Sequence, residues 1–449
     1  MGRGELEERQ QRLNAAMKRI IAAALALSST LSLLAAPLPS RRNEVVEVVE
    51  KVAPSVVNIA AEQMVRRRPS MFDEFFFGFD PRQRRERSQS LGSGVIIDPK
   101  GIILTNDHVI SGASKIIATT KSGLELECEV VGSDADNDLA VLRARKPGAP
   151  LPAIRLGTSS DLMIGETVVA IGNPFGLSNT VTAGVLSALG RSVRGNENQR
   201  LYTDFLQIDA PINPGNSGGP VVNIQGDLIG IATAIIGGAQ GIGFAIPIDR
   251  AKRIKDDLLT FGEVRAVWVG LRGRTVTSGG DEGKPRGFRV RSVAPESPAA
   301  RAGIRTGDLV VSVDGLPIDS EDVWQTALST KGPGRPMRVV VRTGTGADRS
   351  VTLQGEKPPA GLGLRVLREQ LGMTVRQTRN GLQITVADRN GLAAKAGLET
   401  GDVLLALNNS RVKDTEDVDR VIQRDYNRST LWLAVGRGRG EYTLTFPLD

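Results

Sequence analysis

The chain has 449 residues, a length typical of about three domains, and 40% of them are hydrophobic. Aromatic residues are only 4% while glycine occupies 51 positions, so we expect β-rich domains with many turns and aliphatic cores. The formal net charge is +7, but the arginines are scattered among carboxylates and accompany no aromatic–basic module, which argues against nucleic-acid binding. One cysteine, Cys128, rules out an intrachain disulfide. One cysteine and one histidine cannot complete a zinc site, so we expect no metal and no other cofactor.

The N-terminal segment, residues 1–43, is predicted to be a signal peptide or a membrane anchor. Lys18 and Arg19 precede an apolar run from Ile20 to Ala36, which is typical of an export signal. The run is marginal for crossing a bilayer of about 30 Å. Leu34 stands where cleavage after Ala36 would want a small residue, so both alternatives stay open.

After this segment, Glu44 to Lys51 is predicted to be a short helix and Ser55 to Ala60 a strand. Residues 62–90 form a long insertion, and loops of this length are usually functional or disordered. A monomer has little reason to expose its five phenylalanines, so we expect a contact with another subunit; the alternative is a loop that binds nothing. These residues are Phe72, Phe75, Phe76, Phe77 and Phe79.

Short apolar runs then alternate with Gly/Asn/Asp turns from Gly92 to Pro247, which is typical of an antiparallel barrel or sandwich. Asp249 to Phe261 has helical spacing and stops before Gly262. The predicted strands are 94–97, 102–105, 115–119, 139–143, 167–171, 180–186, 228–233 and 243–246.

Three motifs within this region carry the residues of a serine hydrolase. The sole histidine, His108, is followed by Asp138 and then by Ser217 within Gly-Asn-Ser-Gly-Gly-Pro. Each has an ordinary alternative, as a structural histidine, a strand-entry aspartate or a glycine turn. Their order and flanks favour Ser217 as nucleophile, His108 as general base and Asp138 as its partner. The amides of Gly215 and Ser217 can point at one oxyanion, and the two glycines after Ser217 are expected to leave room for a substrate backbone.

The last third of the chain repeats itself. Ala300 to Val310 matches Ala394 to Leu404, 94 residues later. Gly270–Leu271 precedes the first copy and Gly363–Leu364 the second. Each Gly-Leu step is predicted to form a tight turn that opens a strand and offers amides to a terminal carboxylate, with the strand pairing to the peptide. We favour the first copy as the ligand binder, because Gly361 makes the entry to the second more flexible; in the alternative, the second packs only against neighbouring subunits.

Five motifs together resemble the HtrA/Deg family of serine endoproteases, and the repeated Ala-Gly-x-x-x-Gly-Asp resembles its two PDZ domains. The motifs lie at 105–110, 138–142, 170–176, 213–220 and 241–247. The resemblance covers roughly residues 44–449. It implies a mainly-β chain: a chymotrypsin-like double β-barrel protease domain over 44–261, with 62–90 as its regulatory loop, then α/β PDZ domains over 262–356 and 357–449.

The resemblance also implies an ATP-independent periplasmic endopeptidase for protein quality control under stress. Its expected partners are unfolded polypeptides and their C-termini, copies of itself in trimers or multiples of trimers, and the membrane at the N-terminus. It implies a specificity pocket without a carboxylate, which admits small or aliphatic residues, formed by Ile212, Ala234 and Ile235. Asp107 departs from the asparagine usual in the family, and a carboxylate there favours a protonated imidazole if it faces the ring.

Two other functions were weighed. A non-catalytic chaperone or scaffold would hold clients without cutting them, but the intact His, Asp and Ser motifs argue against it. An esterase or lipase on an α/β-hydrolase fold would need the order Ser, Asp, His and helices between its strands, and neither is present.

Overall fold

The computed structural model describes residues 9–22, 41–62, 89–173, 179–194, 201–213, 215–235, 241–276, 287–344, 346–379, 381–386, 388–408, 410–438 and 440–448. The chain divides into two units, Met1–Glu47 and Val48–Asp449. Residues 9–22 of the first unit form an exposed helix, and none of the helices in these ranges is long and apolar enough to cross a membrane. Most of the apolar run from Ile20 to Ala36, and the five phenylalanines, lie outside the described residues. The export segment and the subunit-contacting loop therefore stay predictions.

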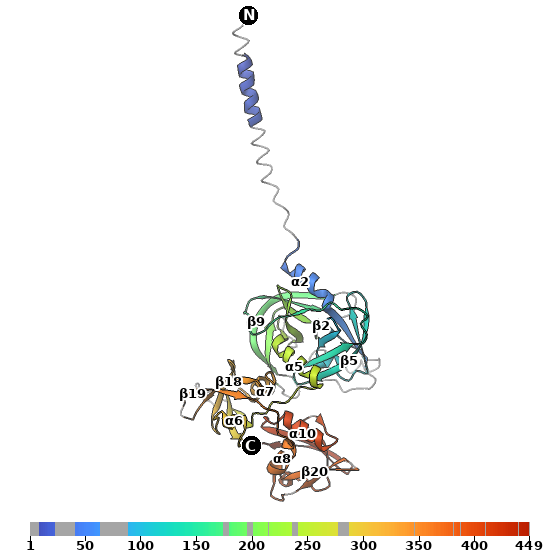
Figure 1. Cartoon of the computed structure of the whole chain (residues 1–449), viewed down its shortest axis with the longest axis vertical. Coiled ribbons are helices and arrows are strands. Elements are labelled where there is room, and N and C mark those ends of the chain that lie inside the picture. Colours follow the sequence, from blue (N-terminus) through green and yellow to red (C-terminus); the bar gives the residue numbers. More distant parts are fainter. Residues whose placement is uncertain are drawn as a thin grey trace. The chain divides into compact units, whose positions relative to one another are not determined.

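The first barrel begins after helix α2 (Glu44–Val52), close to where both elements were predicted. Its strands close in the order β1-β2-β3-β6-β5-β4 (Figure 1). Alternate residues point inward, as in β4, and fill the interior with aliphatic side chains such as Ile59, Ile103 and Leu142. The strands are β1 (Val56–Glu62), β2 (Gln89–Asp98), β3 (Ile102–Thr105), β4 (Lys115–Thr120), β5 (Glu125–Asp134) and β6 (Leu139–Ala144).

The second barrel has the strand order β11-β8-β9-β10-β13-β12-β7, and an additional pairing between β11 and β12 closes it. Helix α5 (Ile248–Phe261) follows and ends at Gly262, whose φ of 75° is the left-handed conformation that stops a helix. It packs on β12 and also on β5 and β6 of the first barrel. The strands are β7 (Arg155–Leu156), β8 (Thr167–Gly172), β9 (Thr180–Arg194), β10 (Leu201–Ile208), β11 (Pro220–Asn223), β12 (Asp227–Ile235) and β13 (Gly243–Pro247).

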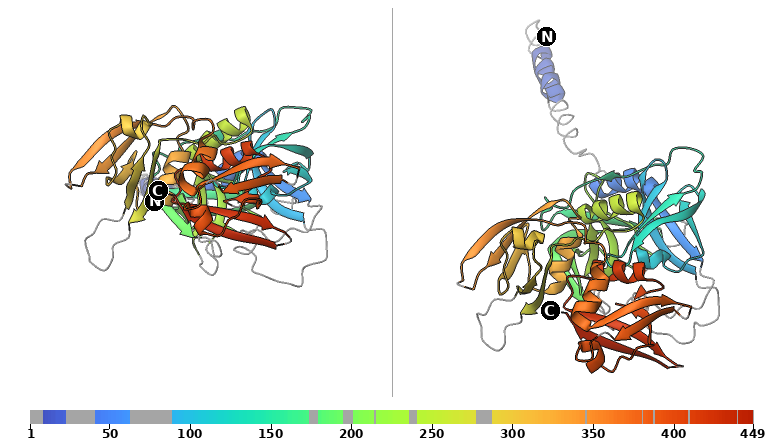
Figure 2. Two further views of the ribbon diagram at one scale, coloured as in Figure 1. Left: turned by 90° about the horizontal axis from the view of Figure 1, so that it is seen from below. Right: turned by 60° about the horizontal axis from the view of Figure 1, so that its bottom comes forward.

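The first repeat is a sheet of order β14-β15-β16-β18-β19 with two short helices (Figure 2). Trp324 of its helix α7 is fully buried and stacks on Phe288, with ring centroids 5.5 Å apart. The elements are β14 (Leu271–Val276), β15 (Gly287–Val293), α6 (Pro298–Arg301), β16 (Leu309–Val313), β17 (Leu316–Pro317), α7 (Glu321–Ser329), β18 (Pro336–Arg342) and β19 (Asp348–Gln354).

The second repeat has the same strand order, β20-β21-β22-β24-β25, which confirms the tandem modules. It differs at its start, where two helical segments precede the first strand. Its elements are α8 (Leu362–Val366), η2 (Leu367–Leu371), β20 (Met373–Thr378), β21 (Gly381–Val386), α9 (Leu392–Lys395), β22 (Val403–Leu407), β23 (Ser410–Arg411), α10 (Thr415–Arg424), β24 (Thr430–Arg437) and β25 (Gly440–Pro447).

The repeated Gly-Asp pair has a structural role in both modules. Asp308 accepts a hydrogen bond from the Arg305 amide (3.0 Å), and Asp402 accepts one from the Glu399 amide (2.9 Å). Each carboxylate thereby fixes the turn that leads into β16 or β22. In the second module Arg437 also binds both carboxylate oxygens of Asp402, at 2.6 and 2.7 Å.

We predict that Asp402→Asn destabilises the second module at neutral pH. Burial opposes ionisation of Asp402, but its hydrogen bonds from Arg437 and the Glu399 amide prevail, and its pKa lies below the usual value. A carboxyl of this kind stabilises the fold above its unfolded pKa and loses that contribution as pH falls through its folded pKa. The substitution should lower the free energy of unfolding by about 1–3 kcal/mol at pH 7.

Urea denaturation at several pH values measures this difference, which should shrink below pH about 4. Asp348→Asn is the matched control, because its ion pair with Arg342 is exposed and should contribute much less than the ion pair of the buried Asp402. A difference that persists undiminished in acid would contradict the prediction.

Candidate active site

The first barrel brings His108 and Asp138 into direct contact. His108 is the second residue of the short helix α4 (Asp107–Ile110), and Asp138 lies immediately before β6. The imidazole Nδ1 lies 2.9 Å from each carboxylate oxygen, and the His108 amide donates to Oδ1 at 3.1 Å. An imidazole that donates Nδ1–H to a carboxylate carries its lone pair on Nε2, the nitrogen that a general base uses.

Asp138 is held from three sides in an unusual backbone conformation. Its φ is +52°, in the left-handed region that non-glycine residues seldom occupy, and it is only 2% exposed. Asn106 Nδ2 donates to its carbonyl at 2.9 Å, and Thr233 Oγ1 donates to Oδ2 at 2.5 Å. Both carboxylate oxygens therefore accept a hydrogen bond, Oδ1 from the His108 amide and Oδ2 from Thr233 Oγ1.

Thr233 of β12 also contacts Ser217. Ser217 Oγ donates to the Thr233 carbonyl at 3.3 Å, so one residue touches both Asp138 and the serine. The β12–β13 register shifts between Ala232 and Ala234, which makes Thr233 the extra residue of a β-bulge. A bulge re-aims the side chain and the carbonyl of its extra residue. No motif in the sequence indicated this role, because it depends on a register shift within a long apolar strand.

The glycines around Ser217 pack against protein backbone. A Cβ on Gly218 would lie 2.1 Å from the Ser93 carbonyl, and one on Gly219 would lie 2.4 Å from the Ile171 carbonyl. The expectation that these two glycines leave room for a substrate backbone is therefore wrong, because the strands behind the turn fill that space. Among the described residues, neither the Gly215 nor the Ser217 amide donates a hydrogen bond to another.

Ser93 in β2 braces the same turn from the first barrel. Its Oγ donates to the Gly215 carbonyl (2.5 Å) and accepts from the Asn173 amide (2.8 Å), while its own amide donates to the Ser217 carbonyl (2.8 Å). The sequence analysis did not identify Ser93. The one indication of its role was a polar residue between two glycines, Gly92 and Gly94, at the start of an apolar strand.

Two of the three residues predicted to form the specificity pocket, Ala234 and Ile235, lie at the end of β12 that pairs with the start of β13. Ala234 pairs with Phe244 and Ile235 with Gly243. Ile212 is buried, and its side chain occupies the space that a Cβ atom on Gly243 would need. None of these three positions carries a carboxylate.

The two Gly-Leu steps have different structures. Gly270 has a φ of 72° and Leu271 opens β14, as predicted. The prediction for Gly363–Leu364 is wrong, because both lie inside helix α8. The counterpart in the second module is Gly372, also with a φ of 72°, followed by Met373 at the start of β20.

Hydrogen bonding supports this correspondence. The Gly270 carbonyl accepts from the Ala294 amide (2.7 Å), and the Gly372 carbonyl accepts from the Asp388 amide (3.0 Å). The error arose because the connection between β14 and β15 is longer than that between β20 and β21. Applying nearly the same sequence offset to the whole of both copies therefore selects Gly363, which precedes the true counterpart, Gly372, in the second copy.

Two other chemistries find no support in this part of the chain. In the described ranges, no group of three His, Cys, Asp or Glu residues could hold a metal ion. Burial raises the pKa of the Cys128 thiol to about 12, so it is not a thiolate at neutral pH. Asp107 is half-buried at the start of α4, and its effect on the imidazole stays a prediction.

Comparisons with known proteins agree with this arrangement. Residues 92–231 match the trypsin-like peptidase domain, and residues 289–343 and 383–435 match the PDZ domain. A probable periplasmic serine endoprotease, DegP-like, from Halomonas elongata is 35% identical over 440 residues, covering 89% of this chain and 91% of that protein. The periplasmic pH-dependent serine endoprotease DegQ of Escherichia coli is 36% identical, covering 86% of this chain and 87% of DegQ.

A solved structure of the HtrA-type protease AlgW with a tripeptide is 34% identical and has a TM-score of 0.51, covering 71% of this chain and 98% of that one. The likeness to DegP- and DegQ-type relatives runs through the barrels that bring His108 to Asp138 and through both repeats. The chain therefore belongs to the HtrA/Deg family of serine endoproteases.

Proposed function

We propose that Ser217 is the nucleophile of this endopeptidase, with His108 as general base and Asp138 as the residue that orients the imidazole. The observation that carries the proposal is the pair of 2.9 Å contacts between His108 Nδ1 and the Asp138 carboxylate. Ser217 Oγ attacks the scissile carbonyl, His108 takes the Oγ proton, and the imidazolium passes it to the leaving amine. Oγ leaves the Thr233 carbonyl during this step.

The amides of Gly215 and Ser217 would stabilise the oxyanion of the tetrahedral intermediate. Both glycines that flank Asn216 and Ser217 have a positive φ, 96° for Gly215 and 82° for Gly218, so the turn reverses sharply. Because neither amide donates to another of the described residues, each can bind the oxyanion without first breaking such a hydrogen bond, and each such donor contributes about 10²–10³ in rate.

The substrates proposed for the enzyme are unfolded or misfolded envelope proteins, degraded in the periplasm without ATP after export directed by residues 1–43. Relatives named as periplasmic endoproteases support this location. The two PDZ domains would capture C-termini or extended segments, and the same surfaces can hold clients as a chaperone does. We further propose a trimer or a multiple of trimers, in which the phenylalanine insertion contacts a neighbouring subunit.

The first prediction from this proposal concerns the nucleophile. Ser217→Ala should leave the fold intact and lower casein turnover by about 10⁶-fold, and His108→Ala should cost about as much, because the two act as a unit. Casein digestion with circular dichroism as the folding control measures this. Turnover by Ser217→Ala near the wild-type rate would show that the assignment is wrong.

The second prediction concerns the residue before the cleaved bond. A pocket formed by Ile212, Ala234 and Ile235 should accept valine, alanine or isoleucine, since burying an aliphatic side chain contributes about 1.5–3 kcal/mol. An unpaired lysine there would cost several kcal/mol. Mass spectrometry of peptides from a digested unfolded protein identifies the cut sites. Cleavage mainly after lysine or arginine would refute the pocket.

The third prediction concerns the PDZ domains. Gly270 and Gly372 form the same turn, so each module can offer amides to a terminal carboxylate and an edge strand to the peptide. In the Ser217→Ala background, deleting residues 357–449 should preserve part of the binding of a peptide with a hydrophobic C-terminus, and deleting 262–449 should abolish it. Fluorescence anisotropy measures both. Equal binding by the protease domain alone would exclude this role.

A further inference from the structure

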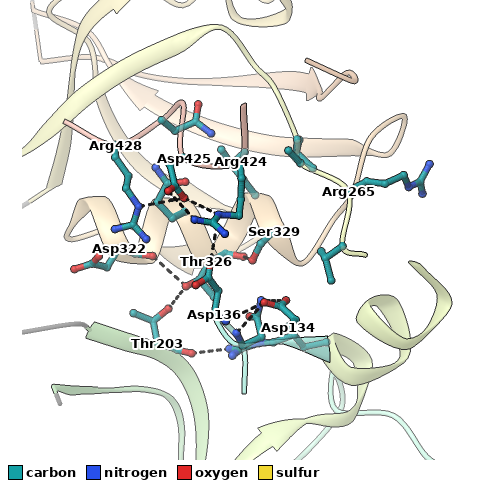
Figure 3. A pocket seen from close by; sticks show the side chains of 18 of the residues that line it. Asp134, Asp136, Thr203, Arg265, Asp322, Thr326, Ser329, Arg424, Asp425 and Arg428 are labelled. Atoms are coloured by element: carbon teal, nitrogen blue, oxygen red, sulfur yellow. Dashed lines mark hydrogen bonds and ion pairs between the residues drawn. The ribbon is translucent and has the colours of Figure 1, made fainter. Parts of the chain in front are cut away.

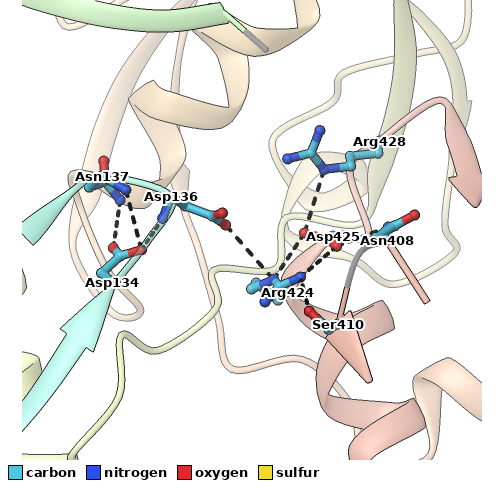
Figure 4. A network of polar contacts seen from close by, with 8 residues as sticks. All are labelled: Asp134, Asp136, Asn137, Asn408, Ser410, Arg424, Asp425 and Arg428. Atoms are coloured by element: carbon cyan, nitrogen blue, oxygen red, sulfur yellow. Dashed lines mark hydrogen bonds and ion pairs between the residues drawn. The ribbon is translucent and has the colours of Figure 1, made fainter. Parts of the chain in front are cut away.

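The turn that carries Asp138 depends on a second aspartate. Asp134 is the last residue of β5 and pairs with Leu139 of β6, so residues 135–138 form the connection between them. Asp134 Oδ1 accepts hydrogen bonds from the amides of Asp136 (2.9 Å) and Asn137 (3.3 Å). Its Oδ2 accepts from Asn137 Nδ2 at 2.6 Å (Figure 4). One carboxylate thus ties down the two residues that precede Asp138.

The Asp138 conformation makes this restraint consequential. A non-glycine residue with φ of +52° is kept there by its surroundings and relaxes when they loosen. On one side Asn106 Nδ2 holds the Asp138 carbonyl. On the other side the chain enters Asp138 directly from Asn137, whose amide and side chain are both bound by Asp134. Without Asp134, the hydrogen bond from Asn106 to the Asp138 carbonyl would remain, but those that hold the amides of Asp136 and Asn137 would be lost.

We propose that Asp134 is a positioning residue for peptide hydrolysis, which fixes the β5–β6 turn so that Asp138 stays in line with His108 Nδ1. The inference rests on the roles proposed above for His108, Asp138 and Ser217. Asp134 itself touches neither the substrate nor the reacting atoms.

The surroundings of Asp134 make this restraint depend on pH. Burial of its carboxyl raises the pKa of Asp134 to about 6, the nearby Asp136 carboxylate acts in the same direction, and its hydrogen bonds oppose them. Across a cavity of about 130 Å³ lie charged groups from the other elements (Figure 3). Arg424 Nε lies 3.8 Å from Asp136 Oδ2 and pairs with Asp425. The remaining charged residues of the lining are Arg250, Arg265, Asp322 and Arg428.

The sign of the effect follows from the raised pKa. Above pH 6 the ionised carboxylate accepts all three hydrogen bonds, and as pH falls through about 6 one oxygen becomes a donor and loses its partner. Asparagine at this position keeps one acceptor oxygen for the two amides and has no titration. Asp134→Asn should therefore remove the contribution of Asp134 to the acid limb of activity.

The test compares the full-length wild type with Asp134→Ala, Asp134→Asn and the control Asp98→Ala. The Asp98 carboxylate accepts the same kind of hydrogen bond, from the Lys100 amide at 2.8 Å, in a turn that carries no site residue. Asp134→Ala should lower kcat for a peptide substrate by about 10²-fold with KM within about twofold, since misplacement by about 1 Å costs this much. Asp134→Asn should recover most of kcat at pH 8.

A spectroscopic measurement reports the geometry without substrate. Because His108 is the only histidine, ¹⁵N-histidine labelling gives a single imidazole in magic-angle-spinning spectra. The Nδ1–H signal should shift or broaden in Asp134→Ala and stay unchanged in Asp98→Ala. If Asp134→Ala fails to fold, the positioning role is tested by comparing the pH profile and the Nδ1–H signal of Asp134→Asn with those of the wild type.

Ser217→Ala, measured alongside, separates two kinds of failure. If Ser217→Ala keeps its activity, the proposed catalytic residues are wrong. If Ser217→Ala is inactive while folded Asp134→Ala matches Asp98→Ala in kcat and in its Nδ1–H signal, the positioning role alone is overturned. An acid limb in Asp134→Asn identical to that of the wild type also counts against it.

Discussion

The His108–Asp138 hydrogen bond is the contact on which the rest of the site depends. It joins a short helix after β3 to a turn before β6, two strands that pair directly in the closed first barrel. The barrel fixes the distance between these backbones, but it does not fix the conformation of the turn. That conformation is held by polar contacts from Asn106, Thr233 and Asp134. Rigid strands bring the residues near one another, and buried hydrogen bonds set the final geometry.

The second constraint is the close approach of the two barrels at Ser217. Gly218 lies against the Ser93 carbonyl with no space for a Cβ, and the Ser93 amide donates to the Ser217 carbonyl. The turn that carries Ser217 in the second barrel is thereby fixed against β2 of the first barrel. The glycines after Ser217 are thus required by packing between strands, whereas the sequence alone had suggested a requirement of the substrate.

Residues with a local motif could be proposed for the site from the sequence, and residues that contact them through packing could not. His108, Asp138 and Ser217 stand in short motifs, and the alternation of apolar residues predicted most of the strands they lie beside. Thr233 and Ser93 sit within ordinary apolar strands, and their roles follow from pairings between residues far apart in sequence. Gly363 was misplaced for a related reason: the two modules share a strand order but not the length of one connection, and a connection length leaves no trace in the matching motif.

Strand β12 connects the residues proposed for the specificity pocket to those proposed for catalysis. Its bulged residue Thr233 contacts Asp138 and Ser217, and the next two residues, Ala234 and Ile235, are those proposed for the specificity pocket. A side chain that fills the pocket would press on the strand within two residues of the bulge. Because the bulge lacks a regular ladder partner, it is the part of β12 that can shift with the least loss of hydrogen bonding. The proposed pocket and the proposed triad therefore share one short segment of backbone, which would give a poorly fitting substrate a physical route to slower chemistry as well as weaker binding.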